Sequence, residues 1–276
     1  MHMDIIWIIL GSLASLAVLI LLVYLLFLIR PRKGVTPDSA LLCDYAHRGL
    51  HGNRIPENSL AAFALACERG VGIELDVQLS RDGVVMVFHD ATLTRMTGIE
   101  KKLCELDAAE LGRLSLAGTE QTIPTLSEVL SLVSGRVPLL VELKGEDTNV
   151  ALCEKLAKLL CDYRGAYCLE SFNPLLIGQM KKHLPDAFRG LLYTNVCKEK
   201  NNSSLLNRLL TAMALNFIAK PNFIAYHQAY RNALPVRLTT RLWHAPKFVW
   251  TVRTKEELDT ARANGECPIF EHVEAK

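Results

Sequence analysis

The feature that most constrains this sequence is a long uncharged apolar run near its start. Between Ile5 and Ile29 no residue is charged, and only one glycine and two serines interrupt the run. As a helix it would reach about 37 Å, enough to cross a hydrocarbon core of about 30 Å. The run accounts for the positive mean hydropathy of the chain, +0.18. The sequence therefore predicts one membrane segment attached to one ordinary folded domain, which excludes a multi-spanning or a disordered protein.

Two other interpretations of this run fit less well. A cleaved signal peptide has a basic start and a small-residue cleavage site, whereas this chain begins Met-His-Met-Asp. A buried core helix is rarely so long and so apolar on every side. The basic residues Arg30, Arg32 and Lys33 follow the run, and short basic flanks favour the cytoplasmic side of a membrane. We therefore expect a single-pass membrane anchor through residues 5–29, with the domain facing the cytoplasm.

The remaining composition narrows the class of domain. The formal net charge of +2 offers no argument for nucleic acid as a partner. The eight cysteines are scattered without a Cys-x-x-Cys pair, which indicates reduced thiols and not a disulfide framework or a zinc site. We divide the chain into the anchor with its basic flank (1–33), a short polar linker (34–40) and one domain (41–276).

Within that domain, short apolar or β-branched runs alternate with helical patterns. Such alternation favours a parallel sheet, and eight strands favour a closed TIM-like (β/α)8 barrel, an α/β fold with its site at the carboxyl ends of the strands. The strands are expected at 42–46, 72–77, 138–143, 166–170, 189–193, 216–219, 247–252 and 268–271. The helices are expected at 57–69, 125–134, 148–161, 174–183, 203–213 and 254–263.

Polar residues follow the ends of the first three expected strands. Glu74 and Asp76 are two residues apart, so a strand points both to one face. Asp82-Gly83 predicts a hairpin turn, and pairing Arg81 with Val84 would place His89 opposite Asp76. Neighbouring strand ends of a barrel share one side of its mouth. The residues expected to converge there are His47, Arg48, Glu74, Asp76, His89, Glu142 and Lys144.

This set of residue types points to phosphodiester chemistry. Three inward carboxylates repel one another unless a cation neutralises them, and an all-oxygen set suits one divalent cation, Mg²⁺ or Ca²⁺. Arg48 and Lys144 suit an anionic substrate that carries phosphate. Two histidines suit a general base and a general acid near neutral pH. Trp250, at the end of the seventh expected strand, fits either core packing or an apolar wall of the pocket.

At these residues the sequence resembles the glycerophosphodiester phosphodiesterase family. The similarity spans about residues 42–265, in matching order and spacing. The residues that carry it are Ala46-His47-Arg48-Gly49, Pro56-Glu57-Asn58-Ser59, Ile73-Glu74-Leu75-Asp76-Val77, Asp82-Gly83, His89-Asp90 with Leu93, Arg95, Thr97 and Gly98, Ile123-Pro124-Thr125-Leu126, Val141-Glu142-Leu143-Lys144, Ser171-Phe172 and Trp250-Thr251-Val252.

The resemblance implies a TIM-like barrel with a small insertion after the hairpin, about residues 90–122. It implies that Glu74, Asp76 and Glu142 hold the metal, that His47 and His89 form the acid–base pair, and that Arg48 and Lys144 contact the phosphate. We also assign Trp250 to substrate binding, as an apolar wall of the pocket. It also supplies the reaction, in which a glycerophosphodiester and water give glycerol 3-phosphate and an alcohol. We take His47 as the base and His89 as the acid.

Two features keep alternatives open. The anchor would hold the domain near a lipid surface, which favours a lysophospholipid as a possible substrate for lysophospholipase D-like hydrolysis. The chain also departs from the family pattern at Arg253, where Asn is usual, and along the last strand, residues 264–272. That departure motivates a third hypothesis, a non-catalytic membrane-tethered module that binds phosphate ligands.

Overall fold

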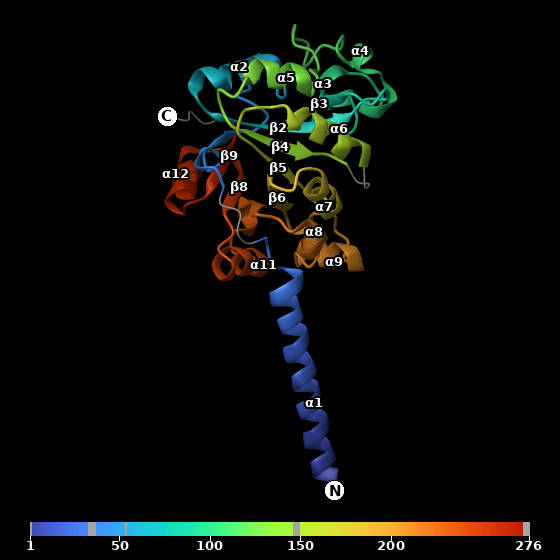
Figure 1. Cartoon of the computed structure of the whole chain (residues 1–276), viewed down its shortest axis with the longest axis vertical. Coiled ribbons are helices and arrows are strands. Elements are labelled where there is room, and N and C mark those ends of the chain that lie inside the picture. The colour runs from blue at the N-terminus through green and yellow to red at the C-terminus, as the bar shows by residue number, and fades with distance from the viewer. Residues whose placement is uncertain (1, 33–36, 53, 146–149, 273–276) are drawn as a thin grey trace.

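The computed structural model of the chain describes residues 2–32, 37–52, 54–145 and 150–272. Eight parallel strands close into a barrel, because β1 pairs with both β9 and β2. The remaining strand, β3, runs antiparallel to β2 outside the closed ring. This confirms the predicted TIM-like (β/α)8 barrel (Figure 1). The strands are β1 (Tyr45–Ala46), β2 (Gly72–Leu79), β3 (Val85–Val87), β4 (Leu139–Leu143), β5 (Tyr167–Ser171), β6 (Phe188–Tyr193), β7 (Phe223–His227), β8 (Lys247–Val252) and β9 (Cys267–Phe270).

The longer helices outside the barrel begin where the sequence supplies a capping side chain. The Ser59 hydroxyl accepts from the Ala62 amide at the start of one helix, and Thr125 and Thr254 each form a capping box. These barrel helices are α2 (Leu60–Arg69), α5 (Leu126–Val133), α6 (Val150–Cys161), α7 (Pro174–His183) and α12 (Lys255–Ala263). Shorter helices are α3 (Thr94–Thr97), α4 (Ala108–Leu111), α8 (Val196–Glu199), α9 (Leu205–Thr211), α10 (Asn216–Ala219) and α11 (Leu234–Arg237).

The sixth expected strand is wrong. Residues 216–219 form helix α10, and the strand follows six residues later as β7, although both begin with the same Asn-Phe-Ile-Ala sequence. Lys220 ends α10 in the left-handed conformation, and Pro221 follows it. Asn222 then donates its backbone N–H to the Arg189 carbonyl, which starts the pairing with β6. Tertiary contacts therefore decide which copy becomes the strand.

The hairpin between β2 and β3 forms, but its register differs by one residue from the prediction. Leu79 pairs with Val85, and the Ser80 backbone N–H donates to the Val84 carbonyl at 3.0 Å. The turn therefore contains three residues, 81–83, with Gly83 at a φ of 76°. A three-residue turn that ends in a left-handed glycine is a common hairpin connection. Asp76 therefore lies opposite Phe88, and His89 is one residue further along the chain.

The barrel interior is apolar toward the amino ends of the strands. Alternate residues of the strands point inward, and aromatic rings from three strands meet there: the centroids of Phe223 and Phe248 are 4.3 Å apart, and those of Phe188 and Phe223 are 5.1 Å apart. Gly190 leaves the space for this cluster, since a Cβ at that position would lie 2.1 Å from the Phe223 ring. The same alternation brings polar side chains inward at the carboxyl ends of several strands.

The segment between β3 and α5 packs around a small apolar cluster of its own. Leu93, Met96, Leu103 and Leu111 are buried there against Phe88. Arg81 ties the hairpin turn to this segment through its ion pair with Asp107. The segment sits above the barrel (Figure 1), on the side of α2 and α5.

The N-terminal run forms a helix that projects from the domain (Figure 1). Met3–Leu28 is long and apolar enough to span a membrane, and most of its side chains are exposed. The N-terminal helix consists of α1 (His2–Val23) and the π-helical segment η1 (Tyr24–Leu28). Ile29 is already buried against the barrel, before the linker expected at 34–40. Residues 33–36 of that region lie outside the described part of the chain.

Candidate active site

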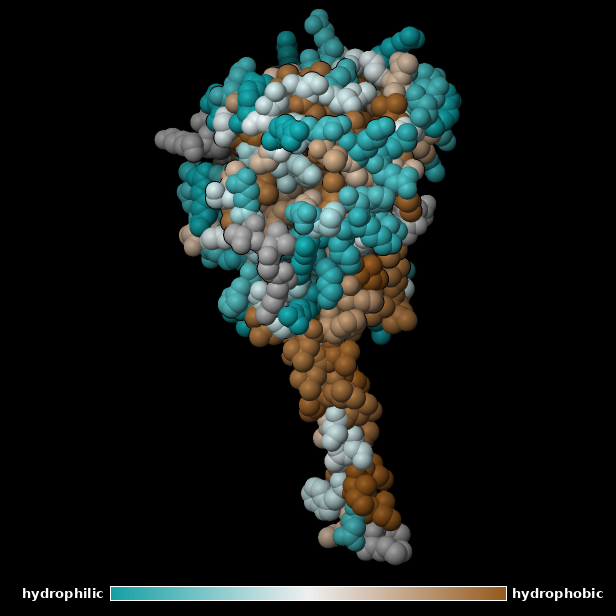
Figure 2. Space-filling model, viewed as in Figure 1, coloured by the Kyte–Doolittle hydropathy of each residue, from teal (hydrophilic) through white to brown (hydrophobic). Residues whose placement is uncertain are grey.

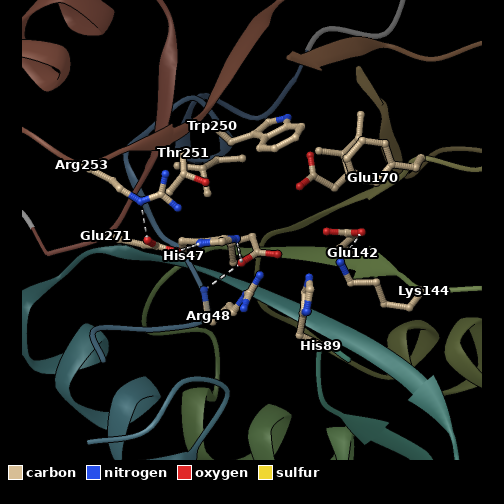
Figure 3. Close-up of a pocket in the computed structure, with 14 residues that line it drawn as sticks. His47, Arg48, His89, Glu142, Lys144, Glu170, Trp250, Thr251, Arg253 and Glu271 are labelled. Atoms are coloured by element: carbon tan, nitrogen blue, oxygen red, sulfur yellow. Dashed lines mark hydrogen bonds and ion pairs between the residues drawn. The ribbon is translucent and has the colours of Figure 1, made fainter. Parts of the chain in front are cut away.

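In several strands the inward face changes from apolar to polar toward the carboxyl end of the strand. In β4 the inward residues are Leu140 and then Glu142, and in β5 they are Cys168 and then Glu170. These carboxylates, further polar residues from the strand ends, and the apolar side chains Leu192, Trp250 and Ile269 surround one pocket of about 290 Å³. Figure 3 shows Glu142, Lys144 and Glu170 on one side of this pocket and Glu271 and Arg253 on the other. Seven of the eight residues predicted for the site line this pocket. The eighth, Asp76, is fully buried and in contact with Lys144.

The three predicted carboxylates form one tight cluster. Glu74, Asp76 and Glu142 each offer an oxygen within 4.8 Å of the others, and all three are buried. Oxygens that share a cation at 2.0–2.6 Å lie up to about 5 Å apart, so this spacing suits one ion. Glu74 Oε1 is buried with no hydrogen-bond partner in the described structure. A divalent cation would satisfy that oxygen, so the residues fit a Mg²⁺ or Ca²⁺ site.

The local backbone explains how Glu74 is held. Arg48 and Gly49 both adopt positive φ angles, 56° and 80°, directly after β1. A Cβ on Gly49 would lie 2.8 Å from the Ala62 Cβ, so only glycine fits this turn. The turn aims the Arg48 backbone N–H at Glu74 Oε2, at 2.8 Å. The His-Arg-Gly sequence thus orients one ligand of the carboxylate cluster through its backbone.

Two cationic side chains neutralise the cluster. Lys144 Nζ lies 2.8 Å from Asp76 Oδ1 and 2.6 Å from Glu142 Oε1. Arg48 Nε lies 3.5 Å from Asp76 Oδ2, and its Nη1 donates to Glu57 at 2.8 Å. Burial lowers the pKa of Lys144, but the two carboxylates outweigh it and raise that pKa above its ordinary value. Both cations therefore stay charged beside the carboxylate cluster.

The carboxylates differ in how easily they ionise. Burial and the charge of Asp76 hold the pKa of Glu74 well above its ordinary value. Burial also raises the pKa of Glu142, to about 7, against the opposing effect of Lys144. Asp76 is equally buried, but Lys144, His89 and Arg48 lower its pKa below the ordinary range. Without a further cation the pocket therefore holds protons on part of its carboxylate cluster.

His47 is fixed by a residue from the last strand end. Its Nδ1 lies 2.5 Å from Glu271 Oε1, and the other oxygen of Glu271 accepts from Arg253 Nε at 3.0 Å. Burial raises the pKa of Glu271, but hydrogen bonding and the charge of His47 lower it to about 2. The carboxylate therefore accepts a proton-bearing Nδ1, which leaves Nε2 of His47 as the nitrogen that can exchange a proton.

His89 is fixed in the same manner from the opposite side. Its Nδ1 lies 2.6 Å from Asp90 Oδ1, and Asp90 is paired with Arg95 at 2.6 Å. Gln78 Nε2 donates to three successive carbonyls, of Phe88, His89 and Asp90, and so holds the backbone here despite the changed register. Burial lowers the pKa of His89, although Asp76 opposes this effect. Both histidines thus present Nε2 as the nitrogen free for proton transfer.

Several residues of the site were not predicted as functional. Asn58 Nδ2 donates to Asp76 Oδ2 at 2.8 Å and so orients that carboxylate. Glu170 pairs in register with Glu142 and lines the pocket, and its Oε2 is buried with no hydrogen-bond partner in the described ranges. Burial and Glu142 hold its pKa well above the ordinary value. Its position as the last residue of the expected 166–170 strand was an available signal, because Glu142 stands at the same place on its own strand.

Trp250 satisfies both interpretations that the sequence left open. Its ring packs against the apolar interior of the barrel and also lines the pocket of about 290 Å³. Its Nε1 donates to the Ala225 carbonyl at 3.0 Å. Phe172 stands against it edge to face, with ring centroids 5.5 Å apart. These two rings form an apolar wall opposite Arg48 and His89.

The fold and the site define a class: a (β/α)8 barrel with an acidic pocket that could hold a cation and is flanked by two oriented histidines. Comparison with known proteins agrees. The model of the glycerophosphoryl diester phosphodiesterase family matches residues 47–272. A glycerophosphodiester phosphodiesterase of Caldanaerobacter subterraneus is 34% identical over 227 residues, which cover 78% of this chain and 87% of that protein.

Solved structures agree as well. An Oleispira antarctica phosphodiesterase, in complex with the product sn-glycerol-3-phosphate, matches with a TM-score of 0.68 at 25% identity, over 83% of this chain and 92% of that one. A glycerophosphodiester phosphodiesterase from Thermotoga maritima matches with a TM-score of 0.63 at 26% identity, over 83% and 94%. The chain belongs to the glycerophosphoryl diester phosphodiesterase family. It is a phosphoric diester hydrolase that acts on glycerophosphodiesters.

Proposed function

We propose that the chain hydrolyses glycerophosphodiesters to glycerol 3-phosphate and an alcohol with one divalent cation, Mg²⁺ or Ca²⁺. Glu74, Asp76 and Glu142 would hold the cation, which supplies Lewis acidity toward a phosphoryl oxygen. Lys144 and Arg48 would bind the remaining phosphate charge, since both are charged and reach the carboxylate cluster. Trp250 would contact the apolar part of the substrate.

We assign the proton transfers to the histidine pair. His47 Nε2 takes a proton from the attacking water, and Glu271 stabilises the imidazolium that forms. His89 Nε2 gives a proton to the oxygen of the departing alcohol, with Asp90 on its other nitrogen. The oxygen–phosphorus bond forms as the bond from phosphorus to the alcohol oxygen breaks. One observation carries this proposal. His47 and His89 both line the pocket beside the carboxylate cluster, and the Nδ1 of each bonds to a carboxylate outside that cluster, Glu271 for His47 and Asp90 for His89.

An activity screen of the purified full chain tests the proposal. Glycerophosphodiesters with several alcohol groups are incubated with Mg²⁺ or Ca²⁺, and glycerol 3-phosphate release is measured. We expect turnover by the wild type and losses of at least about 100-fold in His47→Ala and His89→Ala. His183→Ala is the matched control, because His183 is exposed at the end of α7 and should leave the rate unchanged. No release from any diester, or equal rates in all four proteins, would overturn the proposal.

The same screen separates the non-catalytic alternative. A module that only binds phosphate ligands would retain substrate binding without turnover under either metal. Turnover that disappears in Glu74→Ala would exclude it, because Glu74 belongs to the carboxylate cluster and not to the proton-transfer pair.

We also propose that residues 5–29 form a single-pass membrane anchor, with the barrel of residues 41–276 on the cytoplasmic side. The exposed apolar surface of the helix supports the anchor, and Arg30 and Arg32 support the orientation. Resistance to carbonate extraction tests the first claim. Protease digestion of the domain in inside-out but not right-side-out vesicles tests the second, and the reverse pattern would contradict it.

A further inference from the structure

A second cavity adjoins the catalytic pocket on the side of α9. Its volume is about 820 Å³, within the usual range for a small-molecule site. Most of its wall is apolar, and the residues used below are Phe172, Leu175, Leu192, Leu206, Leu210 and Met213. We call this cavity the α9 groove. None of the roles assigned above to described residues involves this cavity.

The α9 groove and the catalytic pocket are adjacent and share two residues of their walls. Phe172 and Leu192 line both of them. Leu192 is the inward residue of β6, and the Phe172 ring stands against Trp250. A molecule with its phosphodiester at Lys144 can therefore extend past Phe172 into the groove. Such a molecule must carry a phosphodiester at one end and an apolar group beside it.

Three polar side chains in the wall of the groove bond to other groups, and Lys200 is exposed to solvent. Asn207 Nδ2 donates to the Asn202 carbonyl at 2.8 Å, and Asn216 Nδ2 donates to the Ile29 carbonyl at 2.9 Å. Glu199 accepts from the hydroxyl groups of Tyr230 and Thr194. These bonds leave the apolar side chains to define the interior, which suits a hydrocarbon chain better than a polar ligand.

The groove is also joined to the end of the membrane helix. Tyr24 donates its hydroxyl to the Ala212 carbonyl at 2.8 Å, and Phe27 stacks on Phe217 with centroids 5.5 Å apart. Met213 lines the groove and belongs to the same apolar cluster as Ile29. Figure 2 shows apolar surface on the α9 side of the domain, next to the junction with the helix.

The rim of the groove exposes apolar side chains to the outside. Leu206 of α9 is 58% exposed, and Leu175 is 40% exposed. Exposed leucines that adjoin a membrane helix fit a lipid surface, since lipid removes their apolar area from water. The groove therefore connects the place where the helix leaves the lipid with the catalytic pocket.

We infer that the α9 groove binds the acyl chain of a single-chain glycerophospholipid whose phosphodiester occupies the catalytic pocket. This inference rests on the proposed function and names its substrate class. The water oxygen bonds to phosphorus, and the bond from phosphorus to the headgroup oxygen breaks. One proton of the water reaches the headgroup oxygen through the histidines, and the other is released from the product phosphate. The products are an acylglycerol 3-phosphate and the headgroup alcohol.

A ladder of acyl chain lengths tests the inference. The full chain, reconstituted in phosphatidylcholine nanodiscs, receives a deacylated glycerophosphodiester and its 1-acyl derivatives with four, six and eight carbons, all below their micelle-forming concentrations. The headgroup is the one turned over fastest in the activity screen. Burial of a methylene group is worth up to roughly four-fold in affinity, and we expect kcat/KM to rise at least about two-fold per methylene.

Two adjacent leucines supply the matched variants. Leu206→Glu places a charge in the groove, whereas Leu205→Glu places the same charge on the neighbouring exposed position outside it. The ratio of kcat/KM for the eight-carbon and deacylated substrates is independent of the folded fraction. We expect this ratio to fall at least about 10-fold in Leu206→Glu and to stay within about two-fold in Leu205→Glu.

The outcomes distinguish the inference from the proposed function. Flat kcat/KM along the ladder, with clear hydrolysis of the deacylated diester, would overturn the acyl-chain site and leave the proposed function standing. Equal ratios in the two leucine variants would overturn it as well, and would indicate that another occupant covers the groove. Hydrolysis of none of the substrates would overturn both.

Discussion

The contact between His47 and Glu271 allows a sharp prediction about the reaction. Glu271→Gln keeps the size of the side chain but removes its charge. The glutamine amide can donate to Nδ1, which would move the ring proton of His47 to Nε2 and remove the nitrogen that accepts a proton. If instead the amide oxygen faces Nδ1, the imidazolium formed during catalysis has lost its counter-charge. Either arrangement weakens His47 as a base.

The magnitude follows from the geometry. Nδ1 and Oε1 are 2.5 Å apart, and the two side chains are only 13% and 12% exposed. Opposite charges about 4 Å apart interact by about 4 kcal/mol at an effective dielectric constant of 20, which is an upper limit because water reaches this pocket. Half of that limit gives about 2 kcal/mol. We therefore expect kcat/KM to fall by roughly 30- to 1,000-fold, at 1.36 kcal/mol for each factor of ten.

The assay is the initial rate of glycerol 3-phosphate release at saturating divalent cation and neutral pH. Because the pKa of Glu271 is about 2, the wild-type carboxylate is fully ionised there. Glu266→Gln is the matched control: Glu266 is a buried carboxylate paired with Arg231 and Tyr226, away from the pocket. It should lower the melting temperature without changing the rate of the folded protein. A Glu271→Gln rate within about three-fold of wild type would refute the reasoning.

Three other perturbations have defined outcomes. Divalent cation at one hundred times its dissociation constant should raise the free energy of unfolding by about 2.7 kcal/mol, and Glu142→Gln should reduce this gain, both measured by calorimetry. The pKa of Glu142 is about 7 in the folded protein and 4.5 in its ordinary state, so the folded protein binds more protons between these values. The metal-free protein should therefore lose stability as pH rises from 4.5 to 7, and cation affinity should weaken roughly ten-fold per pH unit below 7; flat titrations would contradict this. Gly190→Ala should destabilise the barrel by about 1–3 kcal/mol in denaturant titrations, because its Cβ would collide with Phe223, and wild-type stability would contradict the packing described.

Local sequence signals predicted most of the secondary structure. The helix expected at 174–183 and the strand expected at 247–252 have the observed bounds. For the helix the signal was local, because Asn173 caps it and Pro174 occupies its first turn. The two Asn-Phe-Ile-Ala segments show the limit of such signals. One sequence forms a helix against the N-terminal helix and the other forms a barrel strand, so only the contacts around them distinguish the two.

The site was predictable where the chemistry follows the ends of regular strands. Asp76 and Glu142 are partners in register on adjacent strands, so their meeting follows from topology. Glu271 was not predictable, because it follows a strand that departs from the family pattern and its function depends on contact with His47, 224 residues away in sequence. The α9 groove depends on α8, α9 and α10 packing beside β6, which no local pattern specifies.

Cation titration of the chelated full chain tests the central claim most directly. Binding is followed by calorimetry and turnover by glycerol 3-phosphate release in the same samples, for the wild type and for Glu74→Gln. The account predicts no turnover before Mg²⁺ or Ca²⁺ is added, and a rate that rises in proportion to the occupancy of one site. It also predicts weak binding and little turnover in Glu74→Gln, because Glu74 belongs to the buried carboxylate cluster. Full turnover in the chelated wild type, or full turnover in Glu74→Gln, would contradict it.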